Sequence, residues 1–446
     1  MPIPLHDALK RAEIPPEAVA VYVREAGGGP ALIAHNDKTA FSPASVMKLV
    51  TSDAALELLG PTFTWKTRAF ATGVQNGDVL EGDLVIKGSG DPKMVLENFW
   101  LFMRRIRARG IREIRGNVVL DRSVFEPLAY DPAMFDGDPL KPYNVGPDAL
   151  LVNYKALAVR FVPDAANRRV TVSVDPPFMN YPIAAPRLGN GDCGDWKGRM
   201  RPVIDASGAR FSGVYPASCG ERIWYVHPWQ MTHTQYFDLL FRRIWTELGG
   251  TFKGEVHNGA VPPDARLVAE WESASLSEVI RDINKYSNNV MARQLLLTIA
   301  AQLTSQPGNA ANGAAVVRSW LAGKGIEAPE LLVENGSGLS RNERVAASTL
   351  GSLLDAAFRS PVMPEFIASM PLAGNDGTMR SRVKDRSVAG HAHIKTGMLN
   401  DVRAIAGYVL AASGRRYVVV CLVNHPNAGK AVEMQDMLLE WVYERG

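Results

Sequence analysis

The sequence predicts an α/β (α+β) protein in which both ends of the chain form one domain and the middle forms a β-rich insertion. Three observations predict this class. Two strands joined by a tight turn over residues 19–34 lead into an apolar helix. Two strand-like runs followed by an amphipathic helix occupy residues 404–443. Between these ends, the chain consists mostly of short alternating segments and turns.

The N-terminal part of the chain leads into a helix that is predicted to be buried. Residues 5–12 have the pattern of a short helix, and the glycine-rich turn at 26–30 joins the two strands. In the next helix, Ser42 suits the N-cap and Pro43 suits the first helical position. The apolar run that follows ends at Gly60, which is a helix stop.

The middle part changes character. Short strands are predicted at 66–71, 83–87, 116–120 and 168–174, with a basic helix at 99–109. The stretch 181–220 is rich in Gly, Pro and Asp and is predicted to be loop. A helical period returns at 235–248.

The C-terminal part begins with Ser275 and Glu278, which match a capping box and open a helix. A further helix is predicted over 290–303. The strands at 404–409 and 417–423 and the helix at 431–443 complete the domain that the N-terminal part began.

Composition and charge argue against several classes of protein. The apolar share of 46% and the charged share of 21% are ordinary for a globular protein, and 446 residues allow two or three domains. A net charge of +3 without a basic stripe does not indicate nucleic-acid binding. No run reaches the length of a transmembrane helix, and the first residues lack the pattern of a signal peptide.

The three cysteines leave the compartment open. Cys421 lies in a strand-like run and is predicted to be a buried apolar residue. Cys193 and Cys219 flank a loop-rich stretch, and a bridge between them would contribute roughly 3 kcal/mol and indicate an oxidising compartment. Two unpaired thiols are the alternative. No cofactor and no metal site are expected.

Ser45 and Lys48 are the candidate nucleophile and base. Residues at i and i+3 share a helix face, so the hydroxyl and the amine can meet. An apolar wall and the positive end of the helix dipole both lower a lysine pKa. A neutral amine beside a hydroxyl can act as a general base. The pattern is weak alone, because residues 381–384 repeat it in a solvated setting.

Two further motifs supply the other groups that acyl transfer needs. Ser287 and Asn289 fall in a break between two helices, although Ser340 and Asn342 repeat this pattern. Lys395, Thr396 and Gly397 occur once, in a strand-like setting. Each residue has an expected role in acyl transfer. Ser45 attacks, Lys48 accepts its proton, Ser287 relays a proton with help from Lys395, and Asn289 binds the substrate amide or Lys48. Lys395 and Thr396 bind a carboxylate, Gly397 admits the substrate backbone, and the N–H groups of Ser45 and Met398 form the oxyanion hole.

In this order, the three motifs resemble the signature of penicillin-binding proteins and serine β-lactamases. The chain is most similar to class C low-molecular-mass penicillin-binding proteins, of the penicillin-binding protein 4 type. The stretches 88–92, 335–341 and 374–378 support this resemblance. About 240 residues separate the first two motifs, which is room for extra domains.

The resemblance implies a serine β-lactamase/transpeptidase-like domain, an antiparallel sheet with helices on both faces, carrying two smaller inserted domains. We expect the catalytic domain at 1–63 and 265–446, domain II at 64–93 and 181–264, and domain III at 94–180. It also implies a periplasmic D-alanyl-D-alanine carboxypeptidase and D-alanyl-diaminopimelate endopeptidase. Such an enzyme acts on peptidoglycan stem peptides and is inhibited by β-lactams, and its signal peptide has been removed ahead of Met1. Peripheral association with the wall or the membrane surface is the further expectation.

Two other functions are weighed against this one. A serine β-lactamase would deacylate quickly, but the long insertion and the lack of a recognisable glutamate-based deacylation element argue against it. A wall-binding protein with a spent site would not need the complete set of chemical residues. A metal site at His391 and His393 lacks a third ligand, so these side chains are expected to line the groove or face solvent.

Overall fold

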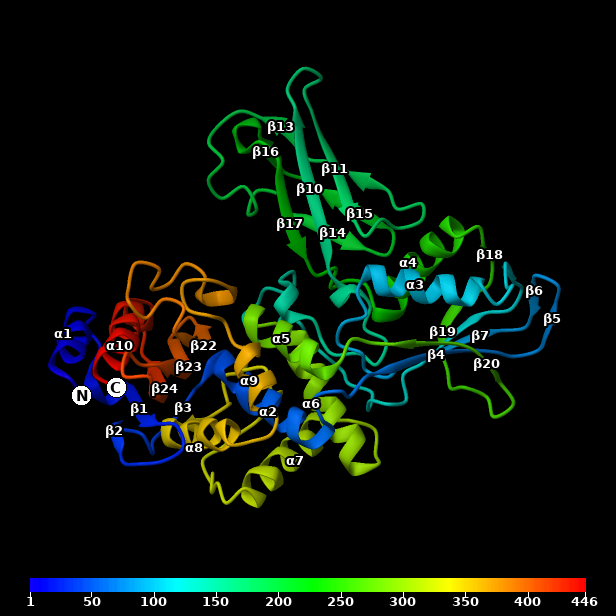
Figure 1. Ribbon diagram of the computed structural model, residues 1–446. Coiled ribbons are helices and arrows are strands. Elements are labelled where there is room, and N and C mark those ends of the chain that lie inside the picture. Colours follow the sequence, from blue (N-terminus) through cyan, green and yellow to red (C-terminus); the bar gives the residue numbers. More distant parts are fainter. The chain divides into compact units, whose positions relative to one another are not determined.

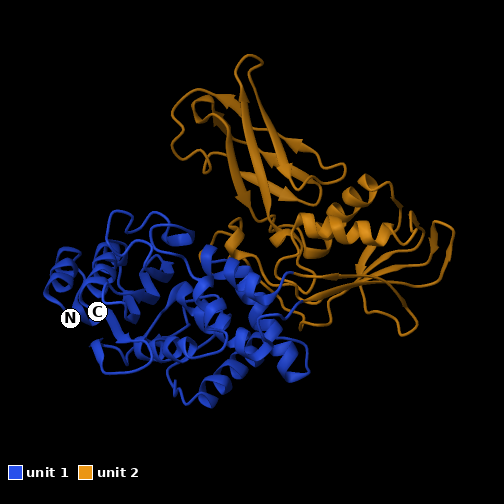
Figure 2. Cartoon of the chain, viewed as in Figure 1, with its two compact units in different colours: residues 1–64, 274–446 blue, residues 65–273 orange.

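The computed structural model describes residues 1–446, and contacts divide the chain into two compact units (Figure 2). Unit 1 comprises Met1–Thr64 and Ala274–Gly446, and unit 2 comprises Trp65–Ser273. Both ends of the chain therefore share one unit. The expected three-part domain division stays a prediction, because the contacts resolve only two units. No helix combines the length and the apolar character needed to cross a membrane.

Unit 1 contains the helices and strands that were expected at the two ends, together with further helices and short strands that were not expected. Its elements are α1 (Ile3–Arg11), β1 (Val19–Glu25), β2 (Ala31–His35), β3 (Ala40–Phe41), α2 (Met47–Leu59), α5 (Leu276–Tyr286), α6 (Asn289–Thr304), α7 (Ala310–Gly323), β21 (Val345–Ala346), α8 (Ala347–Phe358), α9 (Met363–Ser369), β22 (Ala392–Leu399), β23 (Val402–Leu410), β24 (Arg416–Asn424) and α10 (Val432–Arg445).

A five-stranded antiparallel sheet of order β2-β1-β24-β23-β22 forms the centre of unit 1. The side chains of β24 alternate between its two faces, yet nearly all are buried, so both faces must be covered. Helices α1 and α10 contact each other and cover one face, where Val419 and Cys421 join their core (Figure 1). Helix α8 packs against β1 and β24.

Helix α2 is the buried helix that the apolar run predicted. Every residue from Met47 to Leu56 is buried, and α2 contacts α5, α6, α7, α8 and α9. It ends at Gly60, as expected, where φ is +86° and a side chain would be strained. The predicted capping box is also confirmed, since the Ser275 N–H donates to Glu278 Oε2 at 3.0 Å at the start of α5.

Unit 2 is built mainly from short strands. Its elements are β4 (Lys66–Ala71), β5 (Val74–Asn76), β6 (Val79–Glu81), β7 (Leu84–Lys87), α3 (Leu96–Arg107), β8 (Glu113–Ile114), β9 (Val118–Asp121), β10 (Leu157–Asp164), β11 (Arg169–Asp175), β12 (Ile183–Ala184), β13 (Arg187–Gly189), β14 (Pro202–Asp205), β15 (Gly208–Phe211), β16 (Val214–Pro216), β17 (Arg222–Val226), α4 (His233–Glu247), β18 (Thr251–Phe252), β19 (Val256–Asn258) and β20 (Arg266–Glu272).

Strand pairing within unit 2 joins segments that are far apart in sequence. One sheet has the order β19-β9-β7-β4-β20, and another has the order β11-β10-β17 (Figure 1). Strand β9, which lies inside the expected 94–180 domain, thus shares a sheet with β4 and β7 from outside it. The core of unit 2 includes stacked and edge-to-face aromatic rings around Phe161.

The prediction that residues 181–220 form loop is wrong in part. Strands β12 to β16 lie in this stretch, each of two to four residues. Such short strands between Gly and Pro residues carry no clear period, so sequence pattern could not reveal them. Cys193 and Cys219 are joined by a disulfide here, while Cys421 is a free and buried thiol.

Candidate active site

Ser45 lies in a single 3₁₀ turn, η2 (Ala44–Val46), immediately before α2. The predicted N-cap at Ser42 is wrong. The backbone N–H of Ser42 donates to Asn424 Oδ1 at 2.7 Å, Asn424 Nδ2 donates to the Ser42 carbonyl at 3.0 Å, and the Ser42 hydroxyl is buried without a partner. Ala44 has a φ of +44°, an uncommon conformation for a residue with a side chain. Asn424 at the end of β24 therefore anchors a strained turn that presents Ser45.

Two glycines approach the backbone of Ser45 closely. A Cβ added at Gly397 would lie 3.1 Å from Ser45 N and 2.6 Å from the Pro43 carbonyl oxygen. A Cβ added at Gly338, where φ is +81°, would lie 2.6 Å from Ser45 N and overlap the Ala44 carbonyl. Larger residues at 338 or 397 would push the turn away. Gly397 thus brings strand β22 against the nucleophile's turn.

Lys48 is the second residue of α2 and is completely buried. Its Nζ is 2.9 Å from Ser45 Oγ and 2.6 Å from Asn289 Oδ1, and it also donates to the Ser337 carbonyl. The i, i+3 spacing of Ser45 and Lys48 therefore brings their side chains together, as helix geometry predicts. Asn289 comes from the first turn of α6, far away in sequence.

Burial lowers the pKa of Lys48 well below its usual value, because the amine loses the hydration that stabilises its charge. The nearby Lys395 ammonium lowers this pKa further, and so does Arg293, whereas the Glu343 carboxylate raises it. Burial and the two cations thus favour the uncharged amine, and Glu343 opposes them. An uncharged amine has a lone pair that can accept a proton, which a lysine at its usual pKa would lack at neutral pH.

Ser287 and Lys395 form the second pair of the site. Ser287 is the C-cap of α5 in the left-handed conformation, with φ of +58°. Lys395 of β22 donates to Ser287 Oγ at 2.8 Å and to the Thr396 carbonyl at 2.8 Å. Burial lowers the pKa of Lys395 to about 7. Near neutral pH this amine can therefore be charged or uncharged, as a group that moves a proton must be.

Thr396 and Met398 lie on the same strand but differ from Lys395 in orientation. The Thr396 hydroxyl donates to Thr378 Oγ1 at 2.6 Å, and the Met398 side chain is exposed. Alternation along β22 places Lys395 and Gly397 on the face toward the Ser45 turn. The roles of Thr396 in carboxylate binding and of the Met398 N–H in the oxyanion hole stay predictions.

Sequence reasoning missed four contributors to the site. The Ser337 carbonyl accepts from Lys48, Gly338 packs against the Ser45 turn, and the buried Glu343 side chain accepts backbone N–H bonds from residues 334–336. Thr378 was also given no role. Two glycines within three residues at 336–338 were the available signal, because both adopt positive φ.

The second copies of the two motifs do not make the contacts that the first copies make. Ser381 and Lys384 are both exposed, as expected for a solvated segment. The Ser340 hydroxyl donates to Oε2 of Glu334, a residue of the same loop. His391 packs against Tyr443 with ring centroids 5.1 Å apart, and His393 is partly buried on β22. No three His, Cys, Asp or Glu side chains gather to hold a metal ion.

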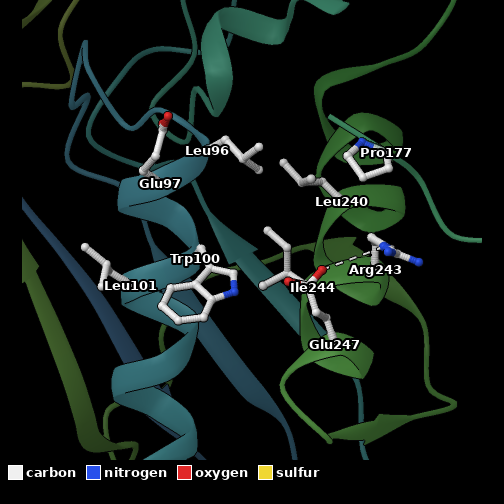
Figure 3. A pocket seen from close by; sticks show the side chains of 9 residues that line it. All are labelled: Leu96, Glu97, Trp100, Leu101, Pro177, Leu240, Arg243, Ile244 and Glu247. Atoms are coloured by element: carbon white, nitrogen blue, oxygen red, sulfur yellow. Dashed lines mark ion pairs between the residues drawn. The ribbon is translucent and has the colours of Figure 1, made fainter. Parts of the chain in front are cut away.

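A separate cavity of about 540 Å³ lies within unit 2, between α3 and α4. Figure 3 shows Leu96 and Trp100 of α3 facing Leu240 and Ile244 of α4 across it. Arg243 and Glu247 form an ion pair at its edge, with Nε and Oε2 3.8 Å apart. The residues around it include no nucleophile beside a base. This cavity therefore offers no candidate pair for covalent catalysis.

Comparison with known proteins gives one consistent result. The D-Ala-D-Ala carboxypeptidase 3 (S13) family matches residues 3–443. The chain is 29% identical to the D-alanyl-D-alanine carboxypeptidase of Actinomadura sp. (strain R39), over 94% of this chain and 80% of that protein.

Two crystal structures share the fold. Penicillin binding protein 4 (dacB) from Haemophilus influenzae is 23% identical, with a TM-score of 0.84 over 99% of this chain and 100% of that one. The same protein in complex with a β-lactam gives a TM-score of 0.79 at 22% identity, again over 99% and 100% of the two chains. The predicted fold class is thereby confirmed.

Proposed function

Because the chain belongs to the D-Ala-D-Ala carboxypeptidase 3 (S13) family, we propose that it is a serine D-alanyl-D-alanine carboxypeptidase that uses Ser45 as its nucleophile. The single observation that carries this proposal is the contact of 2.9 Å between the completely buried Lys48 Nζ and Ser45 Oγ. The substrates are peptidoglycan stem peptides. β-Lactams acylate the same serine, as the complex of the Haemophilus influenzae protein suggests.

The first step follows from the hydrogen bonds of Lys48. An uncharged amine has two N–H groups and one lone pair. Asn289 Oδ1 and the Ser337 carbonyl accept the two N–H groups, so the lone pair faces Ser45 Oγ. The hydroxyl proton passes to Lys48 while Ser45 Oγ attacks the carbonyl carbon of the penultimate D-alanine. The N–H groups of Ser45 and Met398 stabilise the oxyanion.

The second step uses the Ser287 and Lys395 pair. As the peptide bond breaks, the leaving nitrogen takes a proton from the Ser287 hydroxyl, which Lys395 resupplies across their 2.8 Å contact. Free D-alanine leaves, and the peptide stays attached to Ser45 as an ester. Lys48 then gives up to solvent the proton that it took from Ser45, and Lys395 regains one from solvent, so both amines return to their starting states. Water attacks the ester, Lys48 accepts a proton from this water, and the proton passes to Ser45 Oγ as the bond between the acyl carbon and Oγ breaks. Lys395 and Thr396 hold the terminal carboxylate of the substrate during the first step.

Three finer features belong to this proposal. The enzyme also cuts D-alanyl-diaminopimelate cross-links, because its substrate-binding groups can hold either kind of C-terminal residue by its carboxylate. It works in the periplasm, where the disulfide between Cys193 and Cys219 is stable. It associates peripherally with the wall or the membrane surface, where its polymeric substrate is found.

A release assay tests this function against its rivals. The protein is incubated with a peptide ending in D-Ala-D-Ala and, separately, with penicillin. We expect catalytic release of D-alanine and a stable penicillin adduct. Rapid penicillin turnover without an adduct would indicate a β-lactamase. No reaction with either compound would indicate a wall-binding protein without activity.

A further inference from the structure

Glu343 is a buried carboxylate of unit 1 that takes no part in the steps above. It binds the loop whose Ser337 carbonyl contacts Lys48. Its side chain is 1% exposed. One oxygen, Oε1, accepts three backbone N–H groups, from Glu334 at 3.1 Å, Asn335 at 2.9 Å and Gly336 at 2.9 Å. A single carboxylate oxygen therefore fixes three consecutive peptide groups. Such charge-assisted bonds are stronger than bonds between neutral groups.

The segment that Glu343 fixes carries two contacts of the active site. Its Ser337 carbonyl accepts from Lys48 Nζ, and its Gly338 packs against the Ala44–Ser45 peptide. A second anchor comes from α2, since Thr51 Oγ1 donates to the Gly336 carbonyl at 2.8 Å. We call residues 334–338 the Ser337 turn. A shift of this turn would move an acceptor of the base and the support of the nucleophile together.

We propose that Glu343 is a positioning residue for acylation: it fixes the Ser337 turn against Lys48 and Ser45, and its carboxylate charge acts on the Lys48 amine. This inference rests on the proposed function. Glu343 does not touch Ser45, so it is not a catalytic residue.

The charges around Lys48 determine the sign of this effect. Lys395 and Arg293 are cationic neighbours that lower its pKa, and Glu343 is the anionic neighbour that raises it. Burial raises the pKa of Glu343 itself, while its three N–H partners and Lys48 lower it. Removing the negative charge at 343 takes away the one opposing influence. The Lys48 amine then loses its proton at a lower pH.

The variant Glu343→Gln tests this proposal, because the amide oxygen can still accept the three N–H groups while the charge is lost. The rate constant of acylation by penicillin G is measured between pH 5 and pH 10 by intact mass. We expect the acid side of the profile to move to lower pH than in wild type. A role limited to holding the fold would not move this profile.

Glu330→Gln is the matched control. Glu330 is also a carboxylate that accepts a backbone N–H, from Ala346 at 3.1 Å, but it makes no bond to the Ser337 turn. Its profile should coincide with that of wild type. Glu343→Ala removes the acceptor as well, and we expect it to slow acylation at least tenfold in folded protein. Should this variant fail to fold, the pH profile of Glu343→Gln alone decides whether the proposal holds.

A profile of Glu343→Gln that coincides with wild type would overturn the proposal. That failure differs from a failure of the proposed function, in which wild-type protein itself would form no penicillin adduct. The two outcomes are read from the same experiment, since wild type is measured beside each variant.

Discussion

Replacing Ser45 by alanine is expected to abolish adduct formation with penicillin and the release of D-alanine. Ser45 Oγ is the atom that becomes covalently bound. It lies 2.9 Å from Nζ of the buried Lys48, and the two N–H groups of that amine are already accepted by Asn289 and Ser337. No other hydroxyl has a lysine placed in this way. The measurement is intact mass after incubation with penicillin. Wild type should gain the mass of one penicillin molecule, and Ser45→Ala should gain none.

Ser381→Ala is the control for this prediction. Ser381 begins the second copy of the same four-residue pattern, but it is exposed, and so is Lys384. Ser381→Ala should therefore form the adduct as fast as wild type. An adduct that persists in Ser45→Ala, or one lost in Ser381→Ala, would assign the nucleophile to another residue.

Replacing Lys48 by methionine is expected to slow acylation by about 10²–10⁴-fold, the usual contribution of a general base. Methionine keeps an unbranched chain of similar length in the buried site but has no lone pair basic enough to accept the Ser45 proton. The rate constant of adduct formation gives this loss directly. Thermal denaturation of the variant shows whether the fold is kept.

Lys384→Met controls for the removal of a lysine charge and should react at the wild-type rate. If Lys48→Met reacted within threefold of wild type while remaining folded, Lys48 would not be the base. Lys395 would then be the first alternative, because burial lowers its pKa to about 7 and it already contacts a hydroxyl.

Local sequence patterns predicted those parts of the site that depend on one element. Helix spacing placed Lys48 beside Ser45, and the break between two helices placed Ser287 at a helix end. The contact of Asn289 with Lys48 joins two helices distant in sequence, so the set of groups that acyl transfer needs, rather than periodicity, indicated it. The same holds for Lys395 and Ser287.

The parts that sequence could not predict depend on tertiary packing. Ser337 contributes a backbone carbonyl, which every residue has, so its identity carries no signal. Glu343 is buried in a loop without helical or strand period, where a charged residue is normally expected to be exposed. Ser42 looked like a helix cap, but the Asn424 side chain binds its backbone groups instead. In each case a partner more than 200 residues away or an irregular loop decides the geometry.

The most direct test of the central claim is the pH dependence of wild-type acylation by penicillin. If Lys48 is an uncharged base because burial lowers its pKa well below 10.5, the reaction should reach its half-maximal rate on the acid side well below pH 10. If the rate instead kept rising tenfold per pH unit up to pH 10, Lys48 would have its ordinary pKa. Burial of Lys48 would then not activate Ser45.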